Sequence, residues 1–176
     1  TDCLNFGDPE RPEVAYQLEQ CIRGIALACR ALGVPVVSGN VSLYNESEGR
    51  AIYPTPVIGA LGLLEDVEQR CASAFRDAGD VVVLLGTASV EGVPDLLAGS
   101  EVLELVHGLV AGRPAIDLEL EVRVQRCCLR LIRDGLARSA HDCAEGGLAM
   151  AVAESAMLGG LGFKGTLAPD GRWDAA

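Results

Sequence analysis

The stretch that organises this chain is Val34-Pro35-Val36-Val37-Ser38-Gly39-Asn40-Val41-Ser42-Leu43-Tyr44-Asn45. Its first part, Val34 to Val37, is short and rich in β-branched residues, which predicts a buried strand. The small and amide side chains from Ser38 to Ser42 follow at the end of that strand. Polar groups at the end of an apolar strand sit on a rigid scaffold, as many binding residues do. An ordinary strand and turn is the alternative, and this stretch alone leaves both open.

Three of these residues have the chemistry of a nucleotide or metal site. Gly39 has no Cβ, so the backbone there can approach a ligand closely. Asn40 carries a neutral amide oxygen, a hard ligand of the kind that magnesium accepts, and the Ser42 hydroxyl can donate to a phosphate. Asp2 and Asn5 lie near another strand end, where capping or turn bonding is the usual role of such side chains.

The composition is that of a globular protein with an acidic surface. Of its 176 residues, 49% are hydrophobic and 22% are charged, and the formal net charge is -11. This charge disfavours nucleic acids and anionic membranes as partners. No apolar run reaches the roughly 18 to 20 residues of a membrane span, and we expect no signal peptide. We therefore expect a cytoplasmic protein.

The seven cysteines form no Cys-x-x-Cys pair, and neither histidine clusters with them. An odd number of cysteines in apolar stretches is typical of reduced thiols in a cytosolic protein. A zinc site would require closely spaced ligands that this pattern lacks.

Helices and strands alternate along the chain, which predicts an α/β-type fold. The expected helices are Pro12–Leu32, Glu101–Val110, Asp117–Asp134 and Leu148–Leu158. The expected strands lie near the N-terminus and at Val34–Val37, Val57–Leu64, Val81–Gly86, Leu136–Ala140 and Gly162–Leu167. The charged run Glu65–Arg70 between them predicts a domain boundary.

A second polar loop, His141-Asp142-Cys143-Ala144-Glu145-Gly146-Gly147, precedes the last expected helix. A strand, a glycine pair and a helix N-terminus in series can bind an anion through free N–H groups. The pattern is of low specificity, because neither a Walker lysine nor Gly-x-Gly-x-x-Gly is present. No nucleophile–base pair is evident around His141 or His107.

The ends of the sequence lead us to expect a segment of a longer protein. The chain opens on Thr1, directly in a polar motif, and stops at Ala176 just after an expected strand.

Four motifs together resemble one enzyme family, the synthetase subunit of phosphoribosylformylglycinamidine synthase. They are Thr1–Val14 (TDCLNFGDPERPEV), Ser38–Glu46 (SGNVSLYNE), Pro54–Gly59 (PTPVIG) and Ser139–Leu148 (SAHDCAEGGL). Their order and spacing also fit, and the resemblance covers practically the whole chain.

The resemblance implies an α+β fold and a position in the middle of the second of two internal copies. Residues 1–68 would finish the N-terminal, ATP-binding lobe of that copy, and residues 69–176 would begin its C-terminal α/β lobe. The family uses ATP, magnesium and ammonia from a glutaminase to convert formylglycinamide ribonucleotide to the amidine in purine biosynthesis. ATP phosphorylates the substrate amide oxygen, and ammonia then attacks the iminophosphate.

The family's functional residues carry over at four positions. Asp2 and Gly39 fall on ATP-contacting positions, Asn40 on a magnesium ligand and Ser42 on a substrate contact. The catalytic histidine and most magnesium carboxylates belong to the first copy, so we assign no catalytic residue to this chain. The His141–Gly147 loop would face a second, non-catalytic nucleotide site. The stretch from Ala88 to Gly99 resembles the family less and is assigned nothing.

Two alternatives accompany this interpretation. The superfamily also contains aminoimidazole ribonucleotide synthetase, selenophosphate synthetase and thiamine-phosphate kinase, although the Leu4–Gly7 and Gly39–Ser42 motifs favour the amidotransferase. A non-catalytic module that kept the fold is the alternative from a different class.

Overall fold

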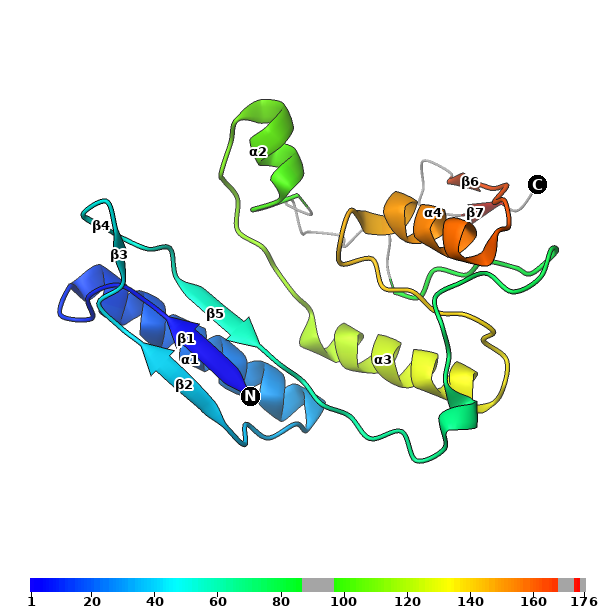
Figure 1. Ribbon diagram of the computed structural model, residues 1–176, viewed down its shortest axis with the longest axis horizontal. Helices are drawn as coiled ribbons and strands as arrows, with labels where there is room; N and C mark the ends of the chain where they lie inside the picture. The colour runs from blue at the N-terminus through cyan, green and yellow to red at the C-terminus, as the bar shows by residue number, and fades with distance from the viewer. Residues whose placement is uncertain (87–96, 168–172, 175–176) are drawn as a thin grey trace. The chain divides into compact units, whose positions relative to one another are not determined.

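A computed structural model describes residues 1–86, 97–167 and 173–174 (Figure 1). The chain divides into two compact units, Thr1–Leu63 and Leu64–Ala176. Helices and mixed sheets confirm the predicted α+β class. Most of the stretch from Ala88 to Gly99 lies outside the described residues.

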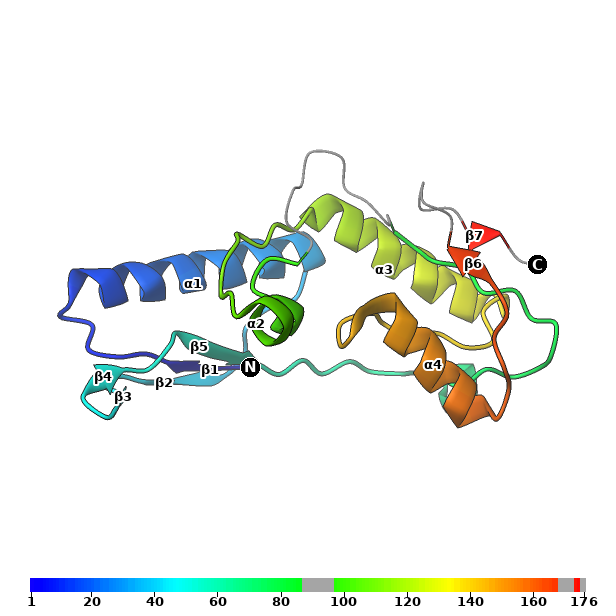
Figure 2. The same cartoon turned by 90° about the horizontal axis from the view of Figure 1, so that it is seen from above.

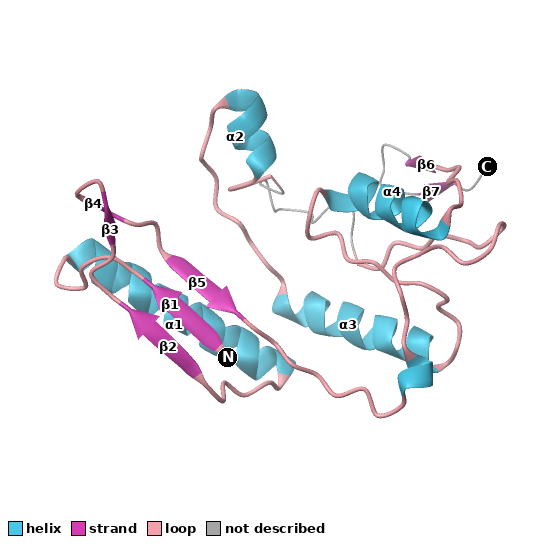
Figure 3. Cartoon of the chain, viewed as in Figure 1, coloured by secondary structure: helices cyan, strands magenta, loops and turns pink. Residues whose placement is uncertain are grey.

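The first unit is a three-stranded sheet covered on one face by one long helix (Figures 2 and 3). The sheet order is β2-β1-β5, with β1 parallel to β2 and antiparallel to β5. Because parallel neighbours need a crossover, α1 connects β1 to β2. A small hairpin, β3-β4, precedes β5. The bounds are β1 Asp2–Asn5, α1 Pro12–Leu32, β2 Gly39–Ser42, β3 Glu46–Ser47, β4 Arg50–Ala51 and β5 Thr55–Ile58.

Helix α1 has the predicted bounds, since both of its ends carry strong signals. Pro12 occupies the first turn, and Gly33 ends the helix in the left-handed region at φ 69°, with its N–H bonded to the Cys29 carbonyl.

The apolar stripe of α1 packs on the sheet. Val14, on this predicted stripe, is buried against Leu4 and Phe6. The stripe residues Leu18, Cys21 and Ile25 pack around this core, whereas Ile22 and Leu32 are exposed.

The predicted strand Val34–Val37 is wrong. These residues have no regular structure, and the strand begins at Gly39, inside the stretch expected to be the polar loop. Likewise β5 is Thr55–Ile58, not Val57–Leu64. A β-branched run becomes a strand only where a neighbour satisfies its backbone groups, and none pairs with Val34–Val37 among the described residues.

The second unit has three α-helices within the part of the chain that the structure describes, and their predicted positions are confirmed to within a few residues. Side chains cap two of them: Ser100 accepts from the Leu103 N–H, and Asp117 accepts from the Glu119 and Leu120 N–H groups. No helix in the described ranges has the length and hydropathy to cross a membrane. The bounds are η1 Val67–Gln69, α2 Glu101–His107, α3 Leu118–Arg133, α4 Gly147–Gly159, β6 Thr166–Leu167 and β7 Trp173–Asp174.

The strands predicted in this unit are mostly absent from the described residues. Val81–Gly86 and Leu136–Ala140 are loops, and only Thr166–Leu167 of the run from Gly162 is a strand, paired antiparallel with β7. As in the first unit, an apolar run without a neighbouring strand stays irregular.

Side chains and backbone groups hold the irregular segment from Cys71 to Gly86 in place. The Phe75 N–H donates to the carbonyl of Ser155 in α4 at 3.0 Å, and the Ala140 N–H donates to the Ala72 carbonyl at 3.0 Å. Arg138 forms ion pairs with Asp77 and Asp80 on one turn of this segment. The aspartate pair, chiefly Asp77, raises the pKa of Arg138 further above its usual value.

Candidate functional site

The pairing of β1 with β2 brings the four predicted site residues together. Asp2 lies opposite Gly39, Cys3 opposite Asn40 and Asn5 opposite Ser42 in the parallel register. Two motifs that are more than thirty residues apart in the chain therefore lie side by side on adjacent strands (Figure 1).

The four residues are divided between the two faces of the sheet. Side chains alternate along a strand, and Leu4 points into the core beneath α1, so Asp2 shares the helix-covered face. The pKa of the Cys21 thiol in α1 agrees with Asp2 lying on this face. Burial is the main cause that raises this pKa, and the negative charge of the nearby Asp2 raises it further. Asn40 and Ser42 lie on the opposite, open face with Cys3 and Asn5.

Gly39 has a structural reason to be glycine. A Cβ built there would lie 2.9 Å from the Cγ of Asp2 and 3.0 Å from its backbone oxygen, and closer still to a carboxylate oxygen. The absent side chain thus makes room for the Asp2 carboxylate over β2. β2 is one of the two edge strands of the described sheet, and the close approach of a ligand to the Gly39 backbone stays a prediction.

Asn40 presents its amide oxygen on the open face. The Cys3 thiol donates to this oxygen at 3.2 Å, and one lone pair stays available for a cation. Magnesium takes six oxygen ligands, usually including carboxylates, phosphates and waters, and no group of three His, Cys, Asp or Glu side chains gathers in the described part of the chain. Asn40 therefore fits magnesium as one ligand among several, the others coming from a nucleotide, water or residues beyond this surface.

The Ser42 hydroxyl is already held by Asn45. The Asn45 amide nitrogen lies 2.9 Å from the Ser42 carbonyl oxygen, 3.1 Å from the Phe6 carbonyl oxygen and 3.1 Å from the Ser42 Oγ, so three acceptors share its two hydrogens. The Ser42 hydroxyl then donates to the Asn45 Oδ1 at 3.2 Å. A phosphate that accepts from Ser42 would have to take this donor from Asn45.

Two residues of this surface were not singled out from the sequence. Cys3 was assigned with the other free thiols, and all seven cysteines are indeed unpaired, but its sulfur contacts Asn40. Asn45 ends the loop after β2 and fixes Ser42. Alternation along β1 predicts that Cys3 and Asn5 share one face. The pairing of β1 with β2, which brings Cys3 to Asn40, joins segments distant in sequence and has no local signal.

The second predicted loop holds His141 between two acceptors. Its Nδ1 lies 2.7 Å from the Asp142 carbonyl oxygen, and its Nε2 lies 3.0 Å from the Glu154 carboxylate of α4. The hydrogen bond to the Asp142 carbonyl is the main influence that raises the pKa of His141; the Glu154 hydrogen bond and the charges of Glu154 and Asp142 add to it, while desolvation opposes it. Both ring nitrogens donate only in the imidazolium form, so this contact favours protonation.

We predict that Glu154→Gln destabilises the protein more at about pH 6 than at about pH 8.5. Because the pKa of His141 is raised in the folded state, its stabilising contribution is complete below its unfolded pKa and is lost as pH rises through the folded pKa. Urea unfolding of the parent and variant at both pH values measures this difference, with His141→Gln as the variant that should remove the pH dependence. Equal losses at both pH values would contradict the assignment.

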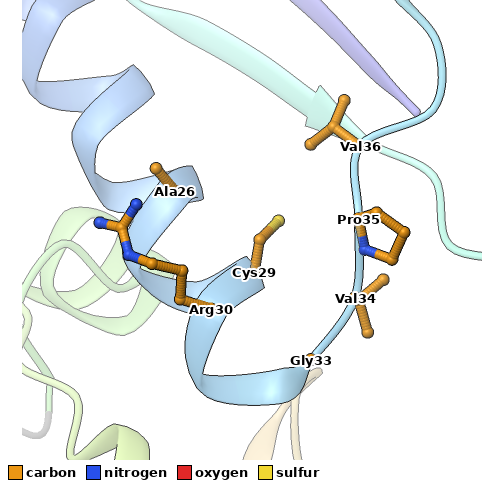
Figure 4. A pocket seen from close by; sticks show the side chains of 7 residues that line it. All are labelled: Ala26, Cys29, Arg30, Gly33, Val34, Pro35 and Val36. Atoms are coloured by element: carbon orange, nitrogen blue, oxygen red, sulfur yellow. The ribbon is translucent and has the colours of Figure 1, made fainter.

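One surface hollow, of about 440 Å³, lies between the end of α1 and the segment after it (Figure 4). Helix residues line one side, and Val34, Pro35 and Val36 line the other. Arg30 is its single charged lining residue, and none of the four predicted site residues lines it. It does not belong to the β1–β2 surface.

Comparison with known proteins gives the family. Residues 1–64 match the model of the AIR synthase related protein, N-terminal domain, and residues 77–175 match that of the AIR synthase related protein, C-terminal domain. The chain belongs to the AIR synthase related family.

Curated relatives show which members of this family the chain is similar to. The chain is 56% identical over 175 residues, 99% of its length, to phosphoribosylformylglycinamidine synthase subunit PurL of Moorella thermoacetica. It is 57% identical over 162 residues (92% of the chain) to the protein of that name from an Anaeromyxobacter species, and 55% identical over 181 aligned positions (100% of the chain) to that from Thermomicrobium roseum. The predicted resemblance is thereby confirmed. The chain spans 20% to 24% of these relatives' lengths.

Proposed function

We propose that this chain is a segment of an ATP-dependent ligase that converts formylglycinamide ribonucleotide, ATP and glutamine-derived ammonia to formylglycinamidine ribonucleotide. The observation that carries the proposal is the β1–β2 register, which places the Asp2 and Gly39–Ser42 motifs side by side on adjacent strands. The chain is also 53–58% identical to subunits named phosphoribosylformylglycinamidine synthase. Residues 1–68 would complete the N-terminal lobe of the second internal copy, and residues 69–176 would begin its C-terminal lobe.

The four site residues have separate roles in this proposal. Asp2 contacts ATP through its carboxylate, and Gly39 contacts ATP through its backbone at the edge of β2. Asn40 ligates magnesium through Oδ1, and Ser42 donates its hydroxyl to the substrate. Magnesium, when bound, would supply positive charge that offsets charge developing on the phosphates. The chain's own residues bind and orient, and we assign no proton transfer to any of them.

The proposal extends to partners and location. The relatives are named as subunits, which supports a complex with a glutaminase that supplies ammonia. We also propose a cytoplasmic location for this protein. The proposed second-copy position would direct the His141–Gly147 loop toward a non-catalytic nucleotide site. The two consecutive left-handed glycines that open α4, Gly146 at φ 68° and Gly147 at φ 70°, leave this helix start without a side-chain cap.

A substrate panel tests the proposed reaction against the superfamily alternatives. The full-length protein containing this segment is incubated with ATP, magnesium and ammonia, and with formylglycinamide ribonucleotide, formylglycinamidine ribonucleotide or selenide in turn. ADP release that requires formylglycinamide ribonucleotide and ammonia, with the amidine as product, is expected. Turnover with either other substrate would assign the chain to aminoimidazole ribonucleotide synthetase or selenophosphate synthetase. No turnover with any of these substrates, nor with thiamine phosphate, would support a non-catalytic module.

A further inference from the structure

The thiol of Cys3 lies in a chain of three polar side chains on the open face of the sheet. Cys3 and Asn40 are register partners on β1 and β2, and Sγ lies 3.2 Å from the Asn40 Oδ1. On the other side, the Asn5 amide nitrogen lies 3.4 Å from the same sulfur. Asn5 is itself fixed by the Cys3 carbonyl at 3.3 Å and the Thr55 carbonyl of β5 at 3.2 Å.

The direction of these hydrogen bonds follows from the donors available. The Asn5 nitrogen can only donate, so the Cys3 sulfur accepts in that contact and shares the two amide hydrogens with the Cys3 and Thr55 carbonyls. The thiol hydrogen is then directed at Asn40, and it needs an oxygen there. Turning the Asn40 amide around would place NH₂ against a sulfur that already accepts from Asn5. The network therefore specifies which end of the Asn40 amide meets β1.

We propose that Cys3, oriented by Asn5, is a positioning residue that holds the Asn40 amide with its oxygen presented for magnesium. This inference rests on the proposed function, because it takes Asn40 as a magnesium ligand. The S–H group occupies one lone pair of Oδ1 and leaves the other for the cation. Outer groups that orient a metal ligand in this way commonly affect metal affinity without touching the metal.

The variants separate the thiol donor from the volume of the side chain. Cys3→Ala and Cys3→Val both remove the donor, and valine keeps nearly the same bulk in a strand that favours β-branched residues. Cys3→Ser keeps a donor. Cys29→Ala is the matched control, since Cys29 is another half-buried free thiol of the first unit and lies at the end of α1, away from Asn40.

Manganese binding to the full-length protein, measured by electron paramagnetic resonance with a non-hydrolysable ATP analogue, is the readout besides activity. We expect Cys3→Ala and Cys3→Val to weaken manganese binding about 10-fold, and Cys3→Ser and Cys29→Ala to stay within about threefold of the parent. The apparent KM for magnesium should rise in the first two variants while kcat at saturating magnesium changes little. Circular dichroism identifies any variant that fails to fold, and the other donor-free variant then carries the comparison.

The outcomes distinguish this inference from the proposed function. If Asn40→Ala weakens manganese binding and both folded donor-free variants do not, the role of Cys3 is overturned and that of Asn40 stands. If Cys3→Ser weakens manganese binding as much as Cys3→Ala does, the sulfur acts through packing and not as a hydrogen-bond donor. That result also overturns the proposed role of Cys3. If Asn40→Ala leaves manganese binding unchanged, the metal assignment of the proposed function fails first.

Discussion

Gly159→Ala is expected to destabilise the second unit by about 3 kcal/mol, the upper end of the cost of overpacking a well-packed site. Ala151, Ser155 and Gly159 follow one another at steps of four along α4 and so share one face of the helix. Ala151 and Ser155 are buried, and the Phe75 N–H donates to the Ser155 carbonyl at 3.0 Å. A Cβ built on Gly159 would lie 3.0 Å from the Phe75 nitrogen and 3.1 Å from its carbonyl carbon. Backbone atoms cannot rotate away as a flexible side chain can.

Gly24→Ala is the matched control for this effect. Gly24 is inside α1, and nothing lies within 4 Å of a Cβ built there. Helix propensity favours alanine by about 0.5–1 kcal/mol at such a position, so this variant should be more stable than the parent. Urea unfolding followed by circular dichroism measures both. A Gly159→Ala variant as stable as the parent would show that α4 does not pack closely on the segment around Phe75.

The helices of this fold could be predicted because their signals are local. Pro12, the apolar stripe and Gly33 determine α1 without reference to any other part of the chain, and Asp117 caps α3 through its own neighbours. The strands could not be predicted as well. Val34–Val37 and Val81–Gly86 have the composition of buried strands, but the described residues provide no partner for either. Conversely, Gly39–Ser42 is a strand because β1 pairs with it.

The sequence predicts a chemistry for the β1–β2 surface, and that chemistry stays a prediction, but the geometry of the surface could not be predicted. The types of Gly39, Asn40 and Ser42 indicated nucleotide, metal and phosphate contacts, and the family resemblance added Asp2. Their division between two faces depends on where Leu4 packs, and the contact of Cys3 with Asn40 depends on the register. Both depend on tertiary contacts between segments distant in sequence, so no local sequence pattern predicts them.

Asn40→Ala in the full-length protein is expected to abolish most synthetase activity without unfolding the protein. The side chain is on an exposed strand and bonds to the Cys3 thiol, so its loss leaves the core of Leu4, Phe6 and Val14 intact. Removing a group that only orients a metal ligand costs about 10- to 100-fold, so loss of a ligand itself should cost at least about 100-fold at limiting magnesium. Val41→Ala, the neighbouring exposed position on the other face of β2, is the matched control and should retain activity.

In our proposal, the open face of β1 and β2 holds magnesium for an ATP-dependent ligase. A magnesium titration of the rate of formylglycinamidine ribonucleotide formation, at fixed ATP and ammonia, tests this most directly when the parent and Asn40→Ala proteins are compared. We expect the variant to require at least about 100-fold more magnesium for its half-maximal rate. Superimposable titration curves from two folded proteins would contradict the proposed magnesium site.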